Sequence, residues 1–261
     1  MNRAEPSFFQ IRLAESAQDL MAAQRLRYRV FVEELGGTGP MVDHDARLER
    51  DEFDPVVDHL CLIDTRRAAD SLDHVVGVYR LLPGDRAEKF GRFYCDTEYD
   101  LAPLRASGRP LLELGRSCVH ADYRGGSAMF LMWNALSDYV LEKKSEILFG
   151  VASFHGTDVQ MLAPSLSWLH HQHMAPVDLR PRAQPDGFVD MDLITPERLD
   201  RREAMVGMPA LIKAYLRVGG LVGEGAYVDR AFNTTDVFLM MDTSEMSPRH
   251  KQFYESRRHT S

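Results

Sequence analysis

Two apolar segments that each lead into a helical pattern constrain the fold of this chain more than any other feature. Residues 111–119 read LLELGRSCV and residues 147–151 read ILFGV. A helix is expected after each segment, over about 128–143 and about 159–173. A strand, a helix and a pair of strands are expected earlier in the chain. This order is typical of an α/β fold with a central mixed, twisted sheet flanked by helices.

The N-terminal part of the chain supplies those earlier elements. Residues 8–13 (FFQIRL) are expected to form the first strand. The helix after it is expected to be capped by Ser16 and to run to about Glu34. Two further runs, 59–64 (HLCLID) and 73–82 (DHVVGVYRLL), alternate in the way that is typical of an antiparallel strand pair.

The remaining segments bear on domain organisation. Residues 37–57 and 83–110 are expected to be irregular, and long ordered loops are usually functional. A length of 261 residues suits one domain with an addition. We therefore expect a core over residues 1–178 and a C-terminal extension over 179–261 that packs on it. The extension is expected to contain a helix over about 196–217 and a final strand.

Composition limits the class of function and the compartment. The chain carries 31 Lys and Arg against 39 Asp and Glu, a net charge of −8. This balance does not suit non-specific nucleic-acid binding, which depends on neutralising phosphates. The three cysteines form no CxxC pair, which indicates free thiols in a reducing compartment. No run approaches the ~18 apolar residues of a membrane span, so we expect a cytoplasmic protein, with peripheral contact at the inner membrane left open.

A first set of candidate binding residues lies at the end of the first helix and in the loop after it. Arg27 and Phe31 are four residues apart and therefore share a helix face. Asp51 and Asp54 enclose a Glu-Phe pair, which places three carboxylates beside an aromatic ring. Such a cluster can bind a cationic amine. An acidic turn on the surface would give the same pattern.

A second set lies on the apolar segment 111–119. Glu113 and Arg116 are charged residues on an expected buried strand, where an unpaired charge costs several kcal/mol. On strict alternation, Glu113 and Gly115 point one way and Arg116 the other. One interpretation is an internal salt bridge. The other is a carboxylate that faces a cleft and acts as a general base.

Several further motifs carry weaker signals. The Gly-rich turn 124–127 precedes a helix and can hold a phosphate, although a plain tight turn has the same sequence. The histidines at 170, 171 and 173 have no matching Cys or carboxylate pattern, so no metal site is predicted. Ser153 lacks the elbow motif of hydrolases, so no catalytic triad is predicted. Cys118 on a strand is more typical of the core than of a nucleophile.

Taken together, these blocks resemble the ornithine N-acyltransferases of ornithine-lipid synthesis, a branch of the GNAT-type N-acyltransferases. The resemblance spans residues 20–253, and it depends on the order and the number of the motifs. The motifs are 27–31 (RYRVF), 51–54 (DEFD), His59, 77–83 (GVYRLLP), 113–120 (ELGRSCVH), 148–150 (LFG), 152–158 (ASFHGTD), 211–217 (LIKAYLR), Gly223 and 232–236 (FNTTD).

The same arrangement of motifs also resembles that of the acyl-homoserine-lactone synthases. The shared positions here are Arg27, Phe31, Asp51, Asp54, Arg80, Glu113 and Arg116. Two departures favour the lipid enzyme. Gly37 stands where those synthases have an aromatic residue, and they lack the 152–158 block and this tail. Ser127 and Met129 stand at the glycine positions of the common GNAT-type phosphate loop, which favours a donor on acyl carrier protein over coenzyme A.

The resemblance implies an enzyme that moves a 3-hydroxyacyl chain from acyl carrier protein to the α-amine of ornithine and so makes lyso-ornithine lipid. It implies no metal or redox cofactor, because the phosphopantetheine of the carrier protein holds the donor. We expect Glu113, as the base, and Arg116 to be catalytic. The residues expected to bind the amino acid are Arg27, Phe31, Asp51, Asp54 and Arg80. Those expected to bind the acyl chain or the phosphopantetheine arm are Cys118, Val119, Arg124, Gly125, Gly126 and Ser153.

Three alternatives stay open. The same reaction on glutamine or lysine is the nearest, because few substitutions in an acidic pocket change the choice of side chain. An enzyme like the acyl-homoserine-lactone synthases would instead use S-adenosylmethionine. A carrier-protein or lipid-binding module that has lost turnover is the non-enzymatic alternative.

Overall fold

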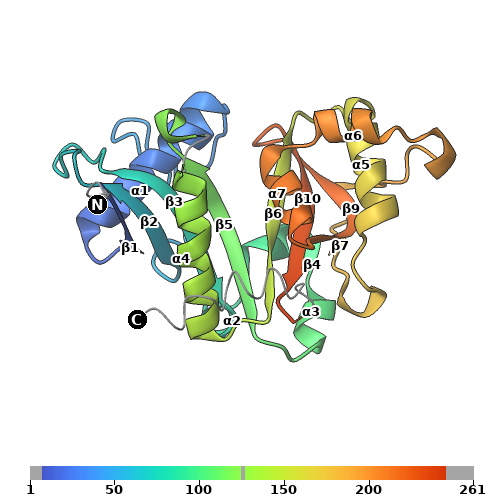
Figure 1. Ribbon diagram of the computed structural model, residues 1–261, viewed down its shortest axis with the longest axis horizontal. Coiled ribbons are helices and arrows are strands. Elements are labelled where there is room, and N and C mark those ends of the chain that lie inside the picture. The colour runs from blue at the N-terminus through green and yellow to red at the C-terminus, as the bar shows by residue number, and fades with distance from the viewer. Residues whose placement is uncertain (1–7, 125–126, 245–261) are drawn as a thin grey trace, which may run out of the picture. The chain divides into compact units, whose positions relative to one another are not determined.

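The computed structural model describes residues 8–124 and 127–244 of the chain (Figure 1). Their contacts divide the chain into two compact units. The first comprises Met1–Leu82 and Leu114–Glu142, and the second comprises Pro83–Glu113 and Lys143–Ser261. The expected boundary between residues 178 and 179 stays a prediction.

The first unit is built on a sheet with strand order β1-β2-β3-β5. Its antiparallel pairing of β2 with β3 confirms the strand pair expected from the sequence. The boundary between the units falls inside β5, whose residues 111–113 belong to the second unit, as do the last residues of β3 and α4. The elements of the first unit are β1 Phe9–Leu13, α1 Ala17–Arg27, the π-helix η1 Tyr28–Glu34, β2 Asp58–Asp64, β3 Val75–Pro83, β5 Leu111–Val119, the 3-10 helix η3 Ala121–Tyr123 and α4 Ala128–Lys143. Between η1 and β2 the chain forms turns and one isolated bridge, so this expected loop is confirmed.

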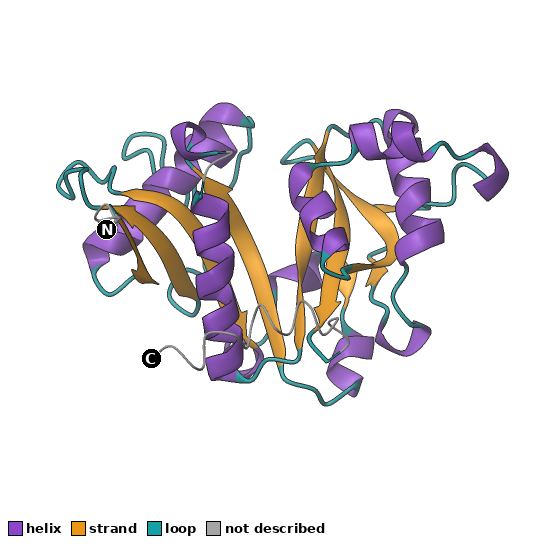
Figure 2. Cartoon of the chain, in the orientation of Figure 1, coloured by secondary structure: helices purple, strands orange, loops and turns teal. Residues whose placement is uncertain are grey.

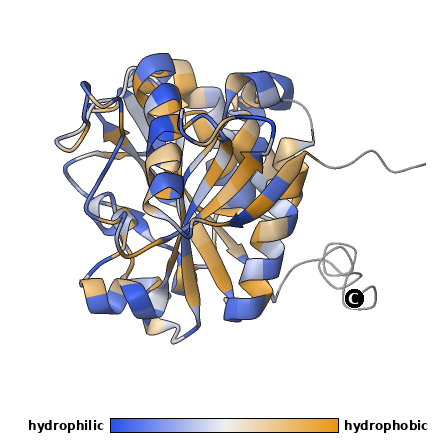
Figure 3. Cartoon of the chain, turned by 90° about the vertical axis from the view of Figure 1, so that its left-hand side faces the viewer, coloured by the Kyte–Doolittle hydropathy of each residue, from blue (hydrophilic) through white to orange (hydrophobic). Residues whose placement is uncertain are grey.

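Helices α1 and α4 cover opposite faces of this sheet (Figure 2). Cys61 and Ile63 of β2 share a buried cluster with the α1 residues Ala22 and Leu26. Leu62 lies between those two strand residues and therefore points to the other face. On that face, Met132 of α4 lies beside Gly77 and Leu62. Because both faces of the sheet are covered, apolar residues concentrate on its strands. Figure 3 shows this from the left-hand side of the view in Figure 1.

The first helix begins and ends in ways that bear on the site. Ser16 caps α1, and its side chain and that of Asp19 form the reciprocal hydrogen bonds of a capping box. The helix continues without a break into η1, so the expected helix to Glu34 is confirmed, with a π-helical last part. Wide π-helical turns are frequent at functional sites, and this one carries Phe31.

The second unit contains the remaining strands. The start of β5 pairs in parallel with β6, followed by β10, β9, β7 and β4, and β8 pairs with β9. Because β6, β10 and β9 are antiparallel, the expected mixed sheet is confirmed. Its strands are β4 Tyr99–Asp100, β6 Ile147–His155, β7 Arg182–Ala183, β8 Phe188–Val189, β9 Leu221–Asp229 and β10 Thr234–Asp242. Its helices are α2 Gly84–Phe90, η2 Tyr94–Thr97, α3 Ala102–Ala106, α5 Val159–His173, η4 Val177–Leu179, η5 Pro196–Arg198, α6 Arg201–Gly207 and α7 Ala210–Arg217.

Two apolar layers cover this second sheet. One contains Phe154 of β6 with residues from α5, α7, β9 and β10. The other is aromatic: Phe149 and Phe238 stack with ring centroids 5.5 Å apart, and Phe93 and Tyr99 pack against them. The segment between β3 and β5 therefore supplies part of the core.

Two expectations for this unit were wrong. Residues 83–110 are not irregular but contain α2, η2, β4 and α3, which are too short for a periodic pattern to reveal. The helix expected over 196–217 is divided into η5, α6 and α7. Pro209 stands between α6 and α7, and a proline there lacks the N–H that a continuous helix needs.

Candidate functional site

A buried network of alternating charges lies in the first unit. It joins the end of α1, the loop after η1, β3 and β5. Three guanidinium groups balance three carboxylates, so the network as a whole is neutral. Its members are Arg27, Glu49, Asp51, Asp54, Arg80 and Arg116.

Arg27 is the centre of this network. Its side chain has no exposed surface, and it pairs with Glu49 through Nε and with Asp54 through Nη1 at 2.6 Å. The Nη2 group also donates to the Glu49 carbonyl at 2.9 Å. Gln24, one helical turn earlier, donates to Asp54 at 2.9 Å. The hydrogen-bond donors of Arg27 are thus bonded to groups of the protein, and these bonds fix Glu49 and Asp54 in position.

Asp51 and Arg116 are the most exposed members, with 18% and 15% of their side chains accessible, against 5% or less for the other four. Arg80 pairs with Asp51. Arg116 donates from Nε to Glu49 at 3.0 Å, and its Nη2 lies 3.6 Å from Asp51. We call Asp51 and Arg116 the rim pair. They are the two most accessible charges of the network.

The backbone at Arg116 is unusual. Its φ angle is +48°, in the left-handed region, which costs an L-residue roughly 1–2 kcal/mol. The alternation expected for Glu113, Gly115 and Arg116 is therefore interrupted at Arg116. The Arg116 guanidinium lies 6.0 Å from the Phe31 ring, so the residue expected from the helix pattern does lie beside the rim pair.

Burial and pairing set the ionisation of the network. Burial alone would raise the pKa of Asp51, but the Arg80 and Arg116 guanidinium groups outweigh it and hold the pKa below its usual value. The pKa of Glu49 is lowered in the same way, against burial, by Arg116 and Arg27. Burial, aided by Arg27, lowers the pKa of His59, whose Nε2 lies 3.2 Å from the Asp54 carbonyl. At neutral pH the carboxylates of Asp51 and Glu49 are therefore ionised and His59 is neutral.

Glu113 belongs to the second unit, at the start of β5. It is buried, and its two carboxylate oxygens accept hydrogen bonds from the backbone N–H groups of Tyr94 at 2.8 Å and Cys95 at 2.7 Å. These bonds anchor the beginning of η2. Its expected role as the base stays a prediction.

The residues expected to bind the donor lie on both sides of η3 and on β6. Burial raises the pKa of the Cys118 thiol, which agrees with its interpretation as a core residue. Arg124 donates to the Val119 carbonyl at 2.9 Å and pairs with Glu34 at 2.6 Å. Ser153 is exposed on β6. Gly125 and Gly126 lie outside the described residues.

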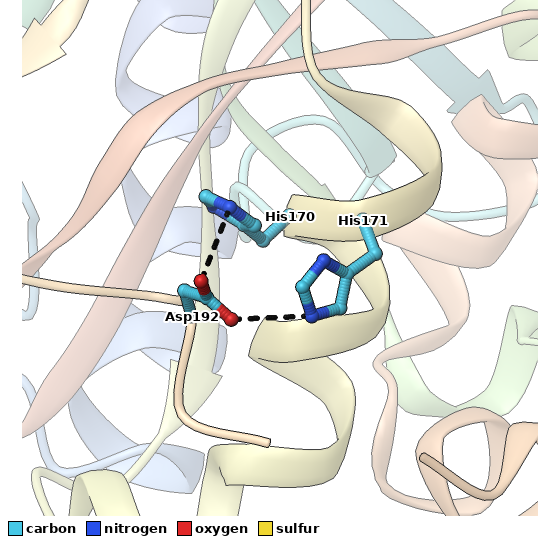
Figure 4. Close-up of side chains that lie close together, drawn as sticks. All are labelled: His170, His171 and Asp192. Carbon is cyan, nitrogen blue, oxygen red and sulfur yellow. Dashed lines mark ion pairs between the residues drawn. The ribbon is translucent and has the colours of Figure 1, made fainter. Parts of the chain in front are cut away.

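The histidine tract of α5 meets a carboxylate. His171 Nε2 lies 3.2 Å from Asp192, and His170 Nε2 lies 4.0 Å from it (Figure 4). The same His171 nitrogen lies 2.9 Å from the Ile194 carbonyl, and a hydrogen bond to that oxygen requires an N–H rather than the lone pair that binds a metal. We therefore interpret these contacts as structural bonds that hold α5 against the segment after β8. A second group, Glu98, Asp229 and Asp236, consists of carboxylates alone.

Sequence reasoning missed Glu49, the residue that links Arg27 to Arg116. It lies in an acidic loop and has no spacing relation to either partner. Its burial, with 3% of the residue exposed, is the signal that identifies it, and that signal exists only in the fold.

Comparison with known proteins places these observations in a family. Residues 26–134 match the model of the acetyltransferase (GNAT) domain. The L-ornithine N(alpha)-acyltransferase of Rhodobacter capsulatus is 65% identical, over 97% of both chains. The protein of the same name from Brucella abortus is 40% identical, over 94% of this chain and 88% of that one.

Solved structures give the same fold at low sequence identity. A CoA-dependent acyl-homoserine lactone synthase superposes with a TM-score of 0.51 at 16% identity, over 95% of this chain and 89% of that one. An N-acyl amino acid synthase from uncultured soil microbes also gives 0.51, at 12% identity, over 91% and 92% of the two chains.

Proposed function

The chain belongs to the family of L-ornithine N(alpha)-acyltransferases, and from this premise we propose that its rim pair receives the amino acid. The enzyme is an N-acyltransferase that acts on the α-amine of ornithine. The observation that carries the proposal is a pair of opposite charges, Asp51 and Arg116, at the accessible edge of an otherwise buried, neutral network. The α-ammonium and α-carboxylate of an amino acid are a matching pair of opposite charges.

Arg27 and Arg80 are the two cations among the residues expected from the sequence to bind the amino acid. Both are almost fully buried, whereas Arg116 keeps exposed surface. We therefore assign the carboxylate to Arg116, whose guanidinium suits two parallel hydrogen bonds. Asp51 attracts the ammonium end. Phe31, beside Arg116, gives the aliphatic part of the substrate an apolar neighbour.

The reaction joins the amine nitrogen to the carbonyl carbon of a thioester and breaks the carbon–sulfur bond. The ammonium first loses a proton, because only the neutral amine has a lone pair to attack with. We propose that Glu113 accepts this proton. The sulfur leaves as a thiolate and takes up the second proton, which the nitrogen loses as the amide forms. No atom changes oxidation state, so the chemistry requires no redox cofactor.

We propose acyl carrier protein as the donor and a 3-hydroxyacyl chain as the group transferred, which makes lyso-ornithine lipid the product. Support comes from the departures of Ser127 and Met129 from the glycines of a coenzyme A loop. Arg124 is the cation expected to meet the single phosphodiester of the arm. The described part of the chain has no helix that is long and apolar enough to cross a bilayer. The single acyl chain of the product favours peripheral contact with the inner membrane.

One assay tests this function. The purified enzyme is incubated with 3-hydroxyacyl carrier protein and an equimolar mixture of the common amino acids with ornithine, and the products are identified by mass spectrometry. We expect one amide, with the mass of ornithine plus the acyl chain less water, and one thiol released per amide. Acylated glutamine or lysine would change the acceptor, and a product from acyl-coenzyme A alone would change the donor. Binding of the carrier protein without any amide would favour the binding-module alternative.

A further inference from the structure

Glu49 connects the centre of the charge network to its rim. One carboxylate oxygen pairs with Arg27 and the other accepts a hydrogen bond from Arg116 Nε at 3.0 Å. Only 4% of the side chain is exposed. A bridging carboxylate of this kind fixes two guanidinium groups relative to one another.

The anchoring of Glu49 makes it a rigid support. Arg27, its inner partner, is fully buried and also bonds the Glu49 backbone carbonyl. The position of the carboxylate is thus determined from both the side chain and the main chain. Because Arg27 in turn is held by Asp54, the support extends back to α1.

Arg116 needs such a support. Its backbone is in the left-handed region, which an L-residue adopts only where its surroundings compensate the cost. The bond to Glu49 engages the Nε edge of the guanidinium and so orients the plane of the group. The terminal nitrogen Nη2 lies 3.6 Å from Asp51, so this end of the guanidinium is on the accessible side of the network.

We propose that Glu49 is a positioning residue, which holds the Arg116 guanidinium in the orientation that recognises the α-carboxylate of ornithine. This inference rests on the proposed function. Glu49 does not touch the substrate; it acts through Arg116. A two-point bond between a guanidinium and a carboxylate depends on the plane of the guanidinium, so loss of the support weakens recognition of the substrate carboxylate.

The test is steady-state kinetics of Glu49→Gln with two acceptors. Ornithinamide keeps the α-amine of ornithine but replaces its carboxylate by a neutral carboxamide. We expect the variant to raise the KM for ornithine about 10-fold or more, to change kcat less, and to leave kcat/KM for ornithinamide within about twofold, because an oriented charge-assisted bond contributes on the order of a factor of ten. The KM for the acyl donor is expected to stay within about twofold.

The matched control is Asp19→Asn. Asp19 is an equally buried carboxylate of the same unit, and it pairs with Arg12 at 2.7 Å outside the charge network. This variant is expected to lower thermal stability but to leave the KM for ornithine unchanged. Glu49→Asp serves as a second variant of the site; it keeps the charge, withdraws the carboxylate by one methylene and should shift the ornithine KM in the same direction.

The outcomes separate the two claims. Loss of selectivity for ornithine over ornithinamide in both Glu49 variants supports the inference. An unchanged KM for ornithine in the Glu49 variants overturns it. It is also overturned if kcat/KM falls equally for ornithine and ornithinamide and the Asp19 control shows the same fall. A wild-type enzyme that acylates no ornithine would instead contradict the proposed function.

Discussion

Replacement of Arg27 by methionine is expected to destabilise the protein by about 3–5 kcal/mol, the usual cost of removing one partner of a buried ion pair. Arg27 compensates two buried carboxylates, Glu49 and Asp54, and its side chain has no exposed surface. Methionine fills a similar volume but supplies no charge or donor. The free energy of unfolding, measured by urea denaturation at pH 7, checks this value, which is a large part of the ~5–15 kcal/mol that a domain has.

Two comparisons make this result specific. Arg29→Met removes a more exposed ion pair with Asp73 from the next turn and is expected to cost less than about 1 kcal/mol. Addition of Glu49→Gln to Arg27→Met is expected to restore part of the lost stability, because it removes the one negative charge by which three carboxylates then exceed two guanidinium groups. An Arg27→Met protein within about 1 kcal/mol of the wild type would show that the network does not hold this unit together.

Replacement of Arg116 by glutamine is expected to lower kcat/KM for ornithine by about 10²–10³-fold. A two-point bond between two charged groups contributes about 3–4 kcal/mol, and each 1.4 kcal/mol corresponds to a factor of ten. The effect on ornithinamide is expected to be much smaller. Arg116→Lys keeps the charge but not the planar fork, so its loss should lie between those of the wild type and the glutamine variant.

The control for this prediction is Arg47→Gln. Arg47 pairs with Glu33 on the surface, and its backbone also has a positive φ angle, so it matches Arg116 in residue type and conformation. Its kinetics are expected to equal those of the wild type. An Arg116→Gln enzyme that keeps its ornithine kcat/KM within about threefold would place the carboxylate of the substrate on another group.

Much of the fold could be predicted because its signals are local. Apolar runs predict β5 and β6, and periodic stretches predict α4 and α5. Each of these patterns can be recognised within a short window of sequence. The short helices between β3 and β5 do not, since each is shorter than the window of about 11 residues in which a helical period can be recognised. The break at Pro209 could have been predicted, because a proline lacks the N–H that a continuous helix needs. The expectation of one helix over 196–217 did not take this into account.

The site could be predicted only in part, for the opposite reason. Residue type and spacing identified Arg27, Asp54 and Arg116 as candidates, and the family resemblance added Arg80. The fold brings these four together. Which acid meets which base is a long-range matter: Arg116 and Glu49 are 67 positions apart in the chain. Burial then decides which charges support the structure and which remain accessible to a ligand.

The most direct test of this account is a crystal structure of the enzyme with ornithine bound. We predict that the α-carboxylate lies about 2.7–3.0 Å from the terminal nitrogens of Arg116, that the α-nitrogen lies on the side of Asp51, and that Arg116 keeps its bond to Glu49. An ornithine molecule whose carboxylate contacts other cations, with Arg116 still bound only within the protein, would contradict the assignment of the rim pair.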